Sequence, residues 1–139
     1  MAVKEFQKDG GGHNLPMISI IDDDESVRRA LHGLMRSVGF AVNVFASAEE
    51  FLDSDRLRNT NCLILDVRLP GMDGLELQRH LAASHSEIPI IFITSYEDDE
   101  VRARALNTGA VDYFLKPFDD EDLLDAIDVA LKSNGFGKK

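Results

Sequence analysis

The sequence predicts an α/β fold of the doubly wound kind, in which helices cover both faces of a five-stranded parallel sheet. Five short apolar runs alternate along the 139 residues with five stretches whose apolar side chains have helical spacing. The runs at 17–21, 62–66 and 88–94 have no polar side, which is typical of interior strands buried on both faces. Strands that alternate with helices pair in parallel through right-handed crossovers, so one domain accounts for the whole pattern.

Turn and cap residues mark the ends of the elements. Gly39 and Gly109 follow helical patterns, where a glycine commonly ends the helix. Ser47 and Glu50 have the spacing of a capping box, and Pro89 stands at the entrance of a strand, where its missing N–H is tolerated. We expect strands at 17–21, 41–45, 62–66, 88–94 and 112–115, and helices at 25–39, 47–54, 74–84, 98–109 and 119–132.

The composition limits the class of protein and its partners. Fifteen Lys and Arg against 25 Asp and Glu give a net charge of −10, which disfavours nucleic-acid contact by this domain. No run approaches the roughly 18 apolar residues of a membrane span, and the N-terminal residues lack the apolar segment of a signal peptide. Cys62 is the only cysteine, so an intrachain disulfide is excluded. We expect a cytoplasmic protein without membrane contact.

The chain divides into three parts. Residues 1–15 are polar, include a run of glycines and read as a flexible leader. Residues 16–132 contain all of the alternating elements and form the folded domain. Residues 133–139 are a polar tail or the start of a linker.

Polar side chains stand where the predicted strands end. They are Asp22 and Asp23 after the first strand, Asp66 at the end of the third, Thr94 at the end of the fourth and Lys116 after the fifth. Because the carboxyl ends of parallel strands meet at one edge of a sheet, we expect these side chains to converge. Any single aspartate at such a place could be a helix cap, and Asp24 is interpreted in that way.

Converging carboxylates need more positive charge than Lys116 alone supplies. Two carboxylates about 4 Å apart repel by roughly 4 kcal/mol at an effective dielectric of about 20. A hard divalent cation such as Mg²⁺, which prefers oxygen ligands, relieves this repulsion. A carboxylate beside Mg²⁺, a hydroxyl and an ammonium is suited to phosphoryl transfer, with Asp66 as the nucleophile and Thr94 and Lys116 binding phosphoryl oxygens.

Four motifs resemble those of the receiver domain of two-component response regulators, the CheY-like family. They are IIDDDESVR, LILDVRLPGMDG, IIFITSYED and VDYFLKPF, each after its own predicted strand, and the resemblance covers residues 16–132. It implies a flavodoxin/CheY-like sheet with strand order 2-1-3-4-5, which the alternation alone does not establish.

The resemblance also implies a role for each residue at the predicted edge. Asp66 would accept a phosphoryl group from the phospho-histidine of a sensor histidine kinase or a phosphotransfer protein. Mg²⁺ (or Mn²⁺) would bind Asp23, Asp66 and the backbone carbonyl of Arg68, and Asp22 would act through water. The chain would catalyse its own phosphorylation and dephosphorylation and would not be a turnover enzyme.

The implied switch begins at Thr94 and Tyr113. Thr94 would move toward the phosphoryl group, and Tyr113 would turn inward and reshape the face formed by 98–109, 112–115 and 119–132. An amphipathic edge-strand residue with a solvated hydroxyl is the alternative interpretation of Tyr113. The bond between Lys116 and Pro117 resembles one that is usually cis in the family.

Other implied properties concern lifetime and output. Arg68 and Tyr96 flank the predicted site and would govern the access of water. The reshaped face, which mixes Arg and Asp side chains, would control a phosphorylation-dependent homodimer or an output such as transcription.

Three alternative functions can be compared with the same motifs. A phosphatase of the haloacid dehalogenase type needs a second aspartate two residues after the first, where this chain has Arg68. A nucleotide- or flavin-binding module needs a glycine-rich phosphate loop, and no such loop follows the first strand. A receiver-like interaction module that takes no phosphate remains the alternative, and phosphate incorporation at Asp66 would separate it from the leading hypothesis.

Overall fold

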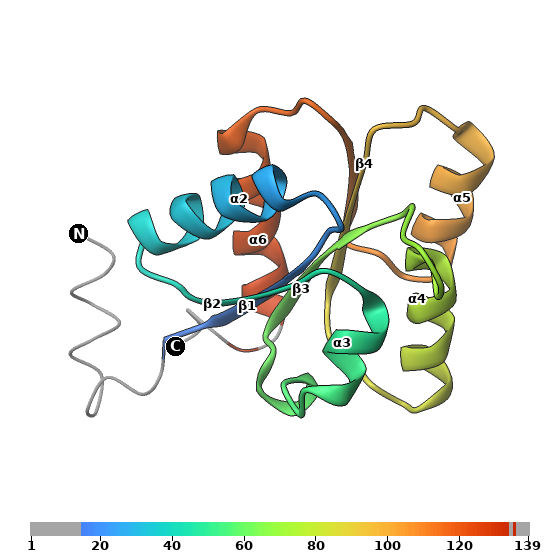
Figure 1. Cartoon of the computed structure of the whole chain (residues 1–139), viewed down its shortest axis with the longest axis horizontal. Helices are drawn as coiled ribbons and strands as arrows, with labels where there is room; N and C mark the ends of the chain where they lie inside the picture. The colour runs from blue at the N-terminus through green and yellow to red at the C-terminus, as the bar shows by residue number, and fades with distance from the viewer. Residues whose placement is uncertain (1–14, 134, 136–139) are drawn as a thin grey trace.

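The computed structural model describes residues 15–133 and Gly135, and within this range strands and helices alternate (Figure 1). In chain order the elements are β1 (Met17–Ile21), α2 (Glu25–Ser37), β2 (Ala41–Phe45), α3 (Ala48–Asp53), a 3₁₀ turn (Leu57–Asn59), β3 (Cys62–Asp66), α4 (Gly74–Ala83), β4 (Ile90–Thr94), α5 (Asp99–Asn107), β5 (Asp112–Leu115) and α6 (Asp120–Ser133).

The strands form one parallel sheet with the order β2-β1-β3-β4-β5, which confirms the expected 2-1-3-4-5 topology. The interior strands are β1, β3 and β4, as predicted from apolar runs that have no polar side. In register, Ile64 of β3 lies between Ile20 of β1 and Ile91 of β4. β4 begins at Ile90, two residues later than predicted; Pro89 still accepts a bond from Leu63 but has no N–H to donate.

Helices cover both faces of the sheet (Figure 1), and each face carries its own apolar core. On one face, α2 and α6 pack through Leu31, Met35 and Ile127 against isoleucines of the interior strands. On the other face, α3, α4 and α5 pack against residues that include Phe92 and Tyr113. Alternate side chains of a strand point to opposite faces, so each interior strand contributes to both cores.

The helix caps explain where several elements begin. Asp24 is the N-cap of α2, as interpreted from the sequence. Ser47 caps α3 through the N–H of Glu50, but the Glu50 carboxylate accepts from Ala46 and not from Ser47, so the predicted capping box is half formed. A complete capping box is instead present at α4, between Asp73 and Glu76.

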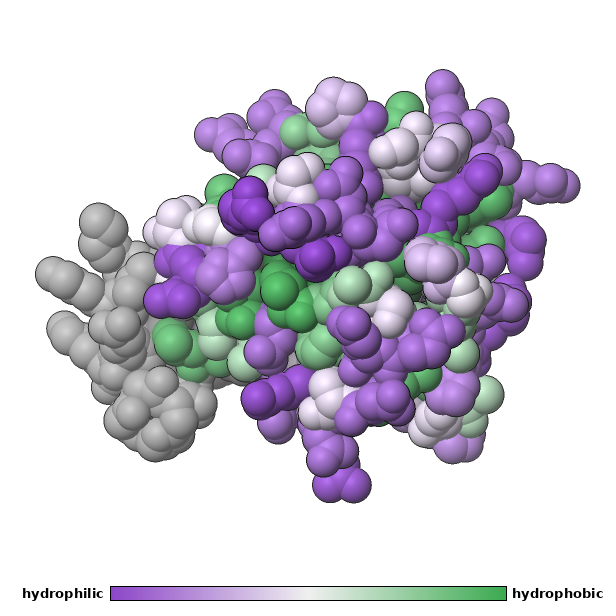
Figure 2. All heavy atoms as spheres, in the orientation of Figure 1, coloured by the Kyte–Doolittle hydropathy of each residue, from purple (hydrophilic) through white to green (hydrophobic). Residues whose placement is uncertain are grey.

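The face of the molecule seen in Figure 2 is mostly hydrophilic. Hydrophobic residues are visible on it in a band between the upper and the lower helices. Within the part of the chain that the structure describes, no helix has the length and apolar character needed to cross a membrane. The predicted leader (residues 1–15) and tail (133–139) lie outside the described residues, except for Leu15, Ser133 and Gly135.

Candidate functional site

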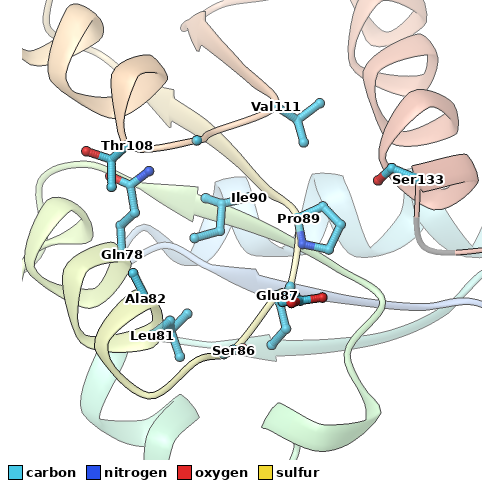
Figure 3. A pocket seen from close by; sticks show the side chains of 12 residues that line it. Gln78, Leu81, Ala82, Ser86, Glu87, Pro89, Ile90, Thr108, Val111 and Ser133 are labelled. Carbon is cyan, nitrogen blue, oxygen red and sulfur yellow. The ribbon is translucent and has the colours of Figure 1, made fainter.

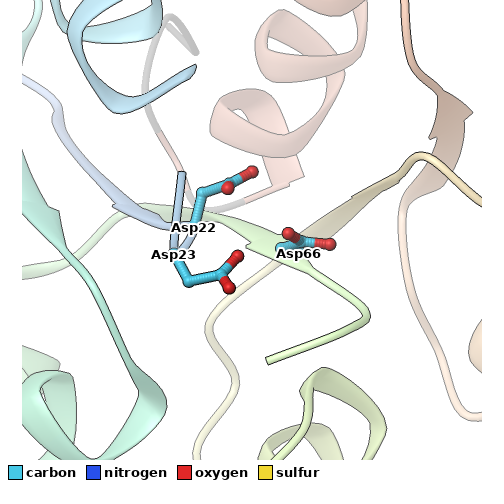
Figure 4. Close-up of side chains that lie close together, drawn as sticks. All are labelled: Asp22, Asp23 and Asp66. Carbon is cyan, nitrogen blue, oxygen red and sulfur yellow. The ribbon is translucent and has the colours of Figure 1, made fainter. Parts of the chain in front are cut away.

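Three aspartates meet at the carboxyl edge of the sheet (Figure 4). Asp22 and Asp23 follow β1, and Asp66 is the last residue of β3, its neighbour in the sheet. Each offers a carboxylate oxygen, and these oxygens lie within 4.8 Å of one another. The predicted convergence of the three acids is therefore confirmed.

The three acids differ in their exposure to water. Asp22 is completely buried and Asp66 is 5% exposed, whereas Asp23 is exposed. The Asp22 carboxylate accepts a hydrogen bond from the backbone N–H of Asp24 at 2.9 Å, and its backbone carbonyl accepts one from Arg28 Nη1 at 2.8 Å. The pocket thus has two buried acids at its base and one exposed acid at its open side.

The Lys116 ammonium lies in the pocket beside two of its carboxylates. Its Nζ lies 2.8 Å from Asp22 Oδ2 and 3.5 Å from Asp66 Oδ2. The backbone N–H of Lys116 donates to the carbonyl of Thr94 at 2.7 Å, which ties the end of β5 to the end of β4. The peptide bond to Pro117 is cis, in agreement with the resemblance.

The electrostatics of the pocket leave excess negative charge. Burial and the nearby Asp22 charge raise the pKa of Asp66 to about 6, against the opposing effect of Lys116. Burial disfavours the Lys116 ammonium, but the hydrogen bond to Asp22 and the charges of both carboxylates outweigh it, so its pKa is raised. A cluster of carboxylate oxygens with one ammonium fits a hard divalent cation.

Thr94 and Tyr113 lie on neighbouring strands beside the pocket. The Thr94 side chain is buried, and its Oγ1 accepts from the backbone N–H of Tyr96 at 3.2 Å. Tyr113 pairs in register with Phe92, two residues before Thr94, and therefore shares its face of the sheet. The Tyr113 ring is buried, and its hydroxyl has no hydrogen-bond partner among the described residues. The alternative of a solvated hydroxyl was therefore wrong.

Arg68 and Tyr96 have exposed side chains, and the backbone N–H of each donates to a residue of the pocket. The backbone N–H of Arg68 donates to Asp66 Oδ1 at 3.2 Å. The Arg68 guanidinium carbon lies 4.1 Å from the centre of the Tyr96 ring. This stacking was not predicted, and neither was the contact of Arg28 with the Asp22 carbonyl. The position of Arg28 at the end of the IIDDDESVR motif, close after the acidic residues, was the sequence signal that could have indicated its contact with Asp22.

A second hollow lies at the opposite edge of the sheet, where β4 and β5 begin (Figure 3). It has a volume of about 270 Å³ and is lined by residues that include Gln78, Pro89, Thr108 and Ser133. Among the described residues that line it, Glu87 is the only one with a charged side chain. It therefore lacks the acidic cluster that distinguishes the carboxyl edge.

Comparison of the chain with models of known protein families shows which family it belongs to. The model of the response regulator receiver domain matches residues 18–128. The chain belongs to this family. A receiver domain is the signal-accepting part of a two-component regulator and not a turnover enzyme, as expected from the sequence.

Curated relatives of this receiver domain are longer proteins. It is 49% identical over 116 residues to the response regulator protein TmoT of Ectopseudomonas mendocina, covering 84% of this chain and 53% of that protein. It is 39% identical over 115 residues to the transcriptional regulatory protein FixJ of Bradyrhizobium diazoefficiens, covering 83% of this chain and 56% of FixJ. The receiver domain thus spans about half the length of these relatives.

Solved structures agree in fold. The response regulator StyR has a TM-score of 0.81 and 45% identity, with 86% of this chain and 61% of that chain covered. The structure named FixJ-N has a TM-score of 0.76 and 39% identity, with 84% of this chain and 94% of that chain covered.

Proposed function

We propose that this receiver domain takes a phosphoryl group on Asp66 from a phospho-histidine of a sensor histidine kinase or of a phosphotransfer protein. The observation that carries the proposal is the position of Asp66, whose carboxylate lies within reach of Lys116 and within 4.8 Å of two further acids. A buried carboxylate beside other carboxylates costs free energy of folding, and a chemical task accounts for its presence.

In the proposed reaction, an Asp66 oxygen attacks phosphorus while the bond from phosphorus to the histidine nitrogen breaks, and its electron pair stays on the nitrogen. The Lys116 ammonium and the Thr94 hydroxyl each bind an oxygen of the transferred group, which has become an aspartyl phosphate. Arg68 supports this geometry through its backbone N–H bond to Asp66. Water would later attack the phosphorus and break its bond to the Asp66 oxygen, which releases inorganic phosphate and restores the carboxylate.

A divalent cation fits the residues of the pocket, and we assign Mg²⁺ (or Mn²⁺) to it. Asp23 and Asp66 would hold the ion directly, together with the backbone carbonyl of Arg68, and Asp22 would act through water. When bound, the ion neutralises charge on the phosphoryl oxygens. The exposure of Asp23 supports this assignment because it leaves a route for a hydrated ion.

The proposed switch couples Thr94 to Tyr113. Phosphorylation adds nearly two negative charges at Asp66 and draws the Thr94 hydroxyl toward them. The Tyr113 ring already lies inside in this conformation, but its hydroxyl has no partner among the residues that the structure describes, so an outward position is a competing state. Phosphorylation would favour the inward ring and thereby reshape the face of α5, β5 and α6.

Output and location are part of the same proposal. The name of FixJ calls it a transcriptional regulatory protein, and we extend transcriptional control to the protein that contains this domain. The α5 and α6 surfaces expose Arg102, Arg104, Asp125 and Asp128, which suits a phosphorylation-dependent homodimer of opposite charges. We also propose the cytoplasm as its location, and 16–132 as the domain, between a flexible leader (1–15) and a tail or linker (133–139).

Incubation with a small phosphodonor and Mg²⁺ tests the proposal. Intact mass should increase by one phosphoryl group in the native chain and remain constant in Asp66→Asn. Gel filtration of both samples tests the proposed dimer. Absence of incorporation in the native chain would instead support the interaction module that takes no phosphate.

A further inference from the structure

The Glu49 side chain joins α3 to the loop that follows the proposed acceptor. Its Oε2 accepts a hydrogen bond from the backbone N–H of Met72 at 2.8 Å, across 23 residues of sequence. This bond is the largest influence on the Glu49 carboxyl and lowers its pKa. The side chain is exposed, so hydrophobic burial does not explain the contact.

Gly71 makes room for this contact. Its φ is +73°, in the left-handed region that favours glycine. A Cβ atom at this position would lie 2.6 Å from Glu49 Oε2. The backbone conformation therefore favours glycine here, and any side chain at this position would have to displace the exposed Glu49 carboxylate.

The Glu49 hydrogen bond holds Met72, at the C-terminal side of a loop whose two ends are already fixed. At one end, the N–H of Val67 donates to Ile93 of β4, and at the other the N–H of Gly74 donates to the Val67 carbonyl. Between these points runs the segment from Arg68 to Met72, which contains the backbone carbonyl that we assign to the cation. The position of that carbonyl depends on what restrains the segment.

We infer that Glu49 is a positioning residue for the cation pocket: it restrains the loop after β3, so that the Arg68 carbonyl is held in place before the ion arrives. The inference rests on the proposed function, because it concerns the same Mg²⁺ ion. Preorganised ligands raise affinity by removing the cost of ordering them on binding. Glu49 itself does not touch the ion.

The neighbouring Glu50 provides a matched control. Both glutamates are exposed, both lie in the first turn of α3, and each accepts one backbone N–H. The partner of Glu50 is Ala46, directly before the helix, whereas the partner of Glu49 is in the acceptor loop. Alanine at either position therefore removes one negative charge from the first turn of α3. Only Glu49→Ala also removes the hydrogen bond to the loop after β3.

Mg²⁺ titration by calorimetry tests the inference. We expect Glu49→Ala to weaken Mg²⁺ binding about fivefold, as the loss of one exposed hydrogen bond to a charged group suggests. Glu49→Gln, which keeps an oxygen acceptor, and Glu50→Ala should both remain within about twofold of the native Kd. Urea unfolding without metal checks that the two alanine variants are similarly stable.

Hydrogen exchange at the Met72 amide gives an independent measurement. The amide should exchange slowly in the native chain and in Glu50→Ala, and faster in Glu49→Ala. Equal Mg²⁺ affinity for the two alanine variants, or fast exchange at Met72 in the native chain, would overturn the inference and leave the proposed function intact. A native chain that binds no Mg²⁺ would overturn both.

Discussion

The Arg68 guanidinium stacks on the Tyr96 ring at 4.1 Å, and this pair connects the loop after β3 to the loop after β4. Arg68 is two residues beyond Asp66 and Tyr96 is two residues beyond Thr94. Both side chains are exposed. We propose that the stack limits the access of water to the proposed acceptor.

Loss of this stack should shorten the lifetime of the phosphorylated form. An exposed cation–π contact contributes about 0.5–1 kcal/mol, so Tyr96→Ala should speed dephosphorylation about two- to fivefold by admitting water more often. Tyr96→Phe keeps an aromatic face and should retain most of the native lifetime. Intact mass followed over time after donor removal measures both rates; an unchanged lifetime in the alanine variant would refute the gating role.

Asp66→Asn should stabilise the metal-free protein near neutral pH. The pKa of Asp66 is raised to about 6 in the folded chain by burial and by Asp22, whereas it is near 3.9 when unfolded. The folded state therefore holds this proton more tightly, and its contribution to stability is present below about pH 4 and is lost as the pH rises through 6. Two pKa units correspond to about 3 kcal/mol at pH 7.

Urea unfolding in EDTA at pH 7.5 and at pH 4.5 measures this effect. The free energy of unfolding of Asp66→Asn should exceed that of the native chain at the higher pH, and the difference should shrink at the lower pH. A less stable variant at pH 7.5 would contradict the assigned direction.

Mg²⁺ should stabilise the native chain, and Asp23→Asn should lose most of that stabilisation. A ligand that binds only the folded state raises the free energy of unfolding by mass action, about 2.7 kcal/mol at 100 times its Kd. Thermal unfolding with and without Mg²⁺ provides the measurement. Asp24→Asn is the matched control, because asparagine also serves as an N-cap and Asp24 lies outside the acidic cluster. If Asp24→Asn lost as much of the stabilisation by Mg²⁺ as Asp23→Asn, the assignment of Asp22 and Asp23 as the acidic pair would be wrong.

Tyr113→Phe should stabilise the conformation described here. The Tyr113 hydroxyl is buried without a hydrogen-bond partner among the described residues, and such a group costs about 1–3 kcal/mol. Removal of the oxygen keeps the ring and its packing near Phe92, 6.4 Å away between centres. Urea unfolding should show a gain of about 1 kcal/mol, and a loss would indicate that the hydroxyl is satisfied in solution.

The sheet and the acidic cluster were predictable because they follow from short-range patterns. Apolar runs without a polar side identified β1, β3 and β4 as interior strands, and parallel pairing then brought Asp22, Asp23 and Asp66 to one edge. The strand order itself needed the resemblance, because alternation is compatible with several orders.

Contacts between loops were not predictable in the same way. The stack of Arg68 on Tyr96 and the bond from Met72 to Glu49 depend on how separate loops approach one another. Glu50 shows the limit even within one helix: its spacing from Ser47 is that of a capping box, yet its carboxylate finds the Ala46 N–H instead. Equivalent local partners compete, and the sequence pattern does not rank them.

The division of the interior into two apolar layers has a consequence for engineering. Tyr113 and Phe92 belong to the layer beneath α3, α4 and α5, whereas Leu31, Met35 and Ile127 belong to the opposite one. Repacking the α2–α6 side should raise the free energy of unfolding without contacting Tyr113, the proposed switch residue. Thermal robustness and signalling sensitivity would then be adjustable as independent traits.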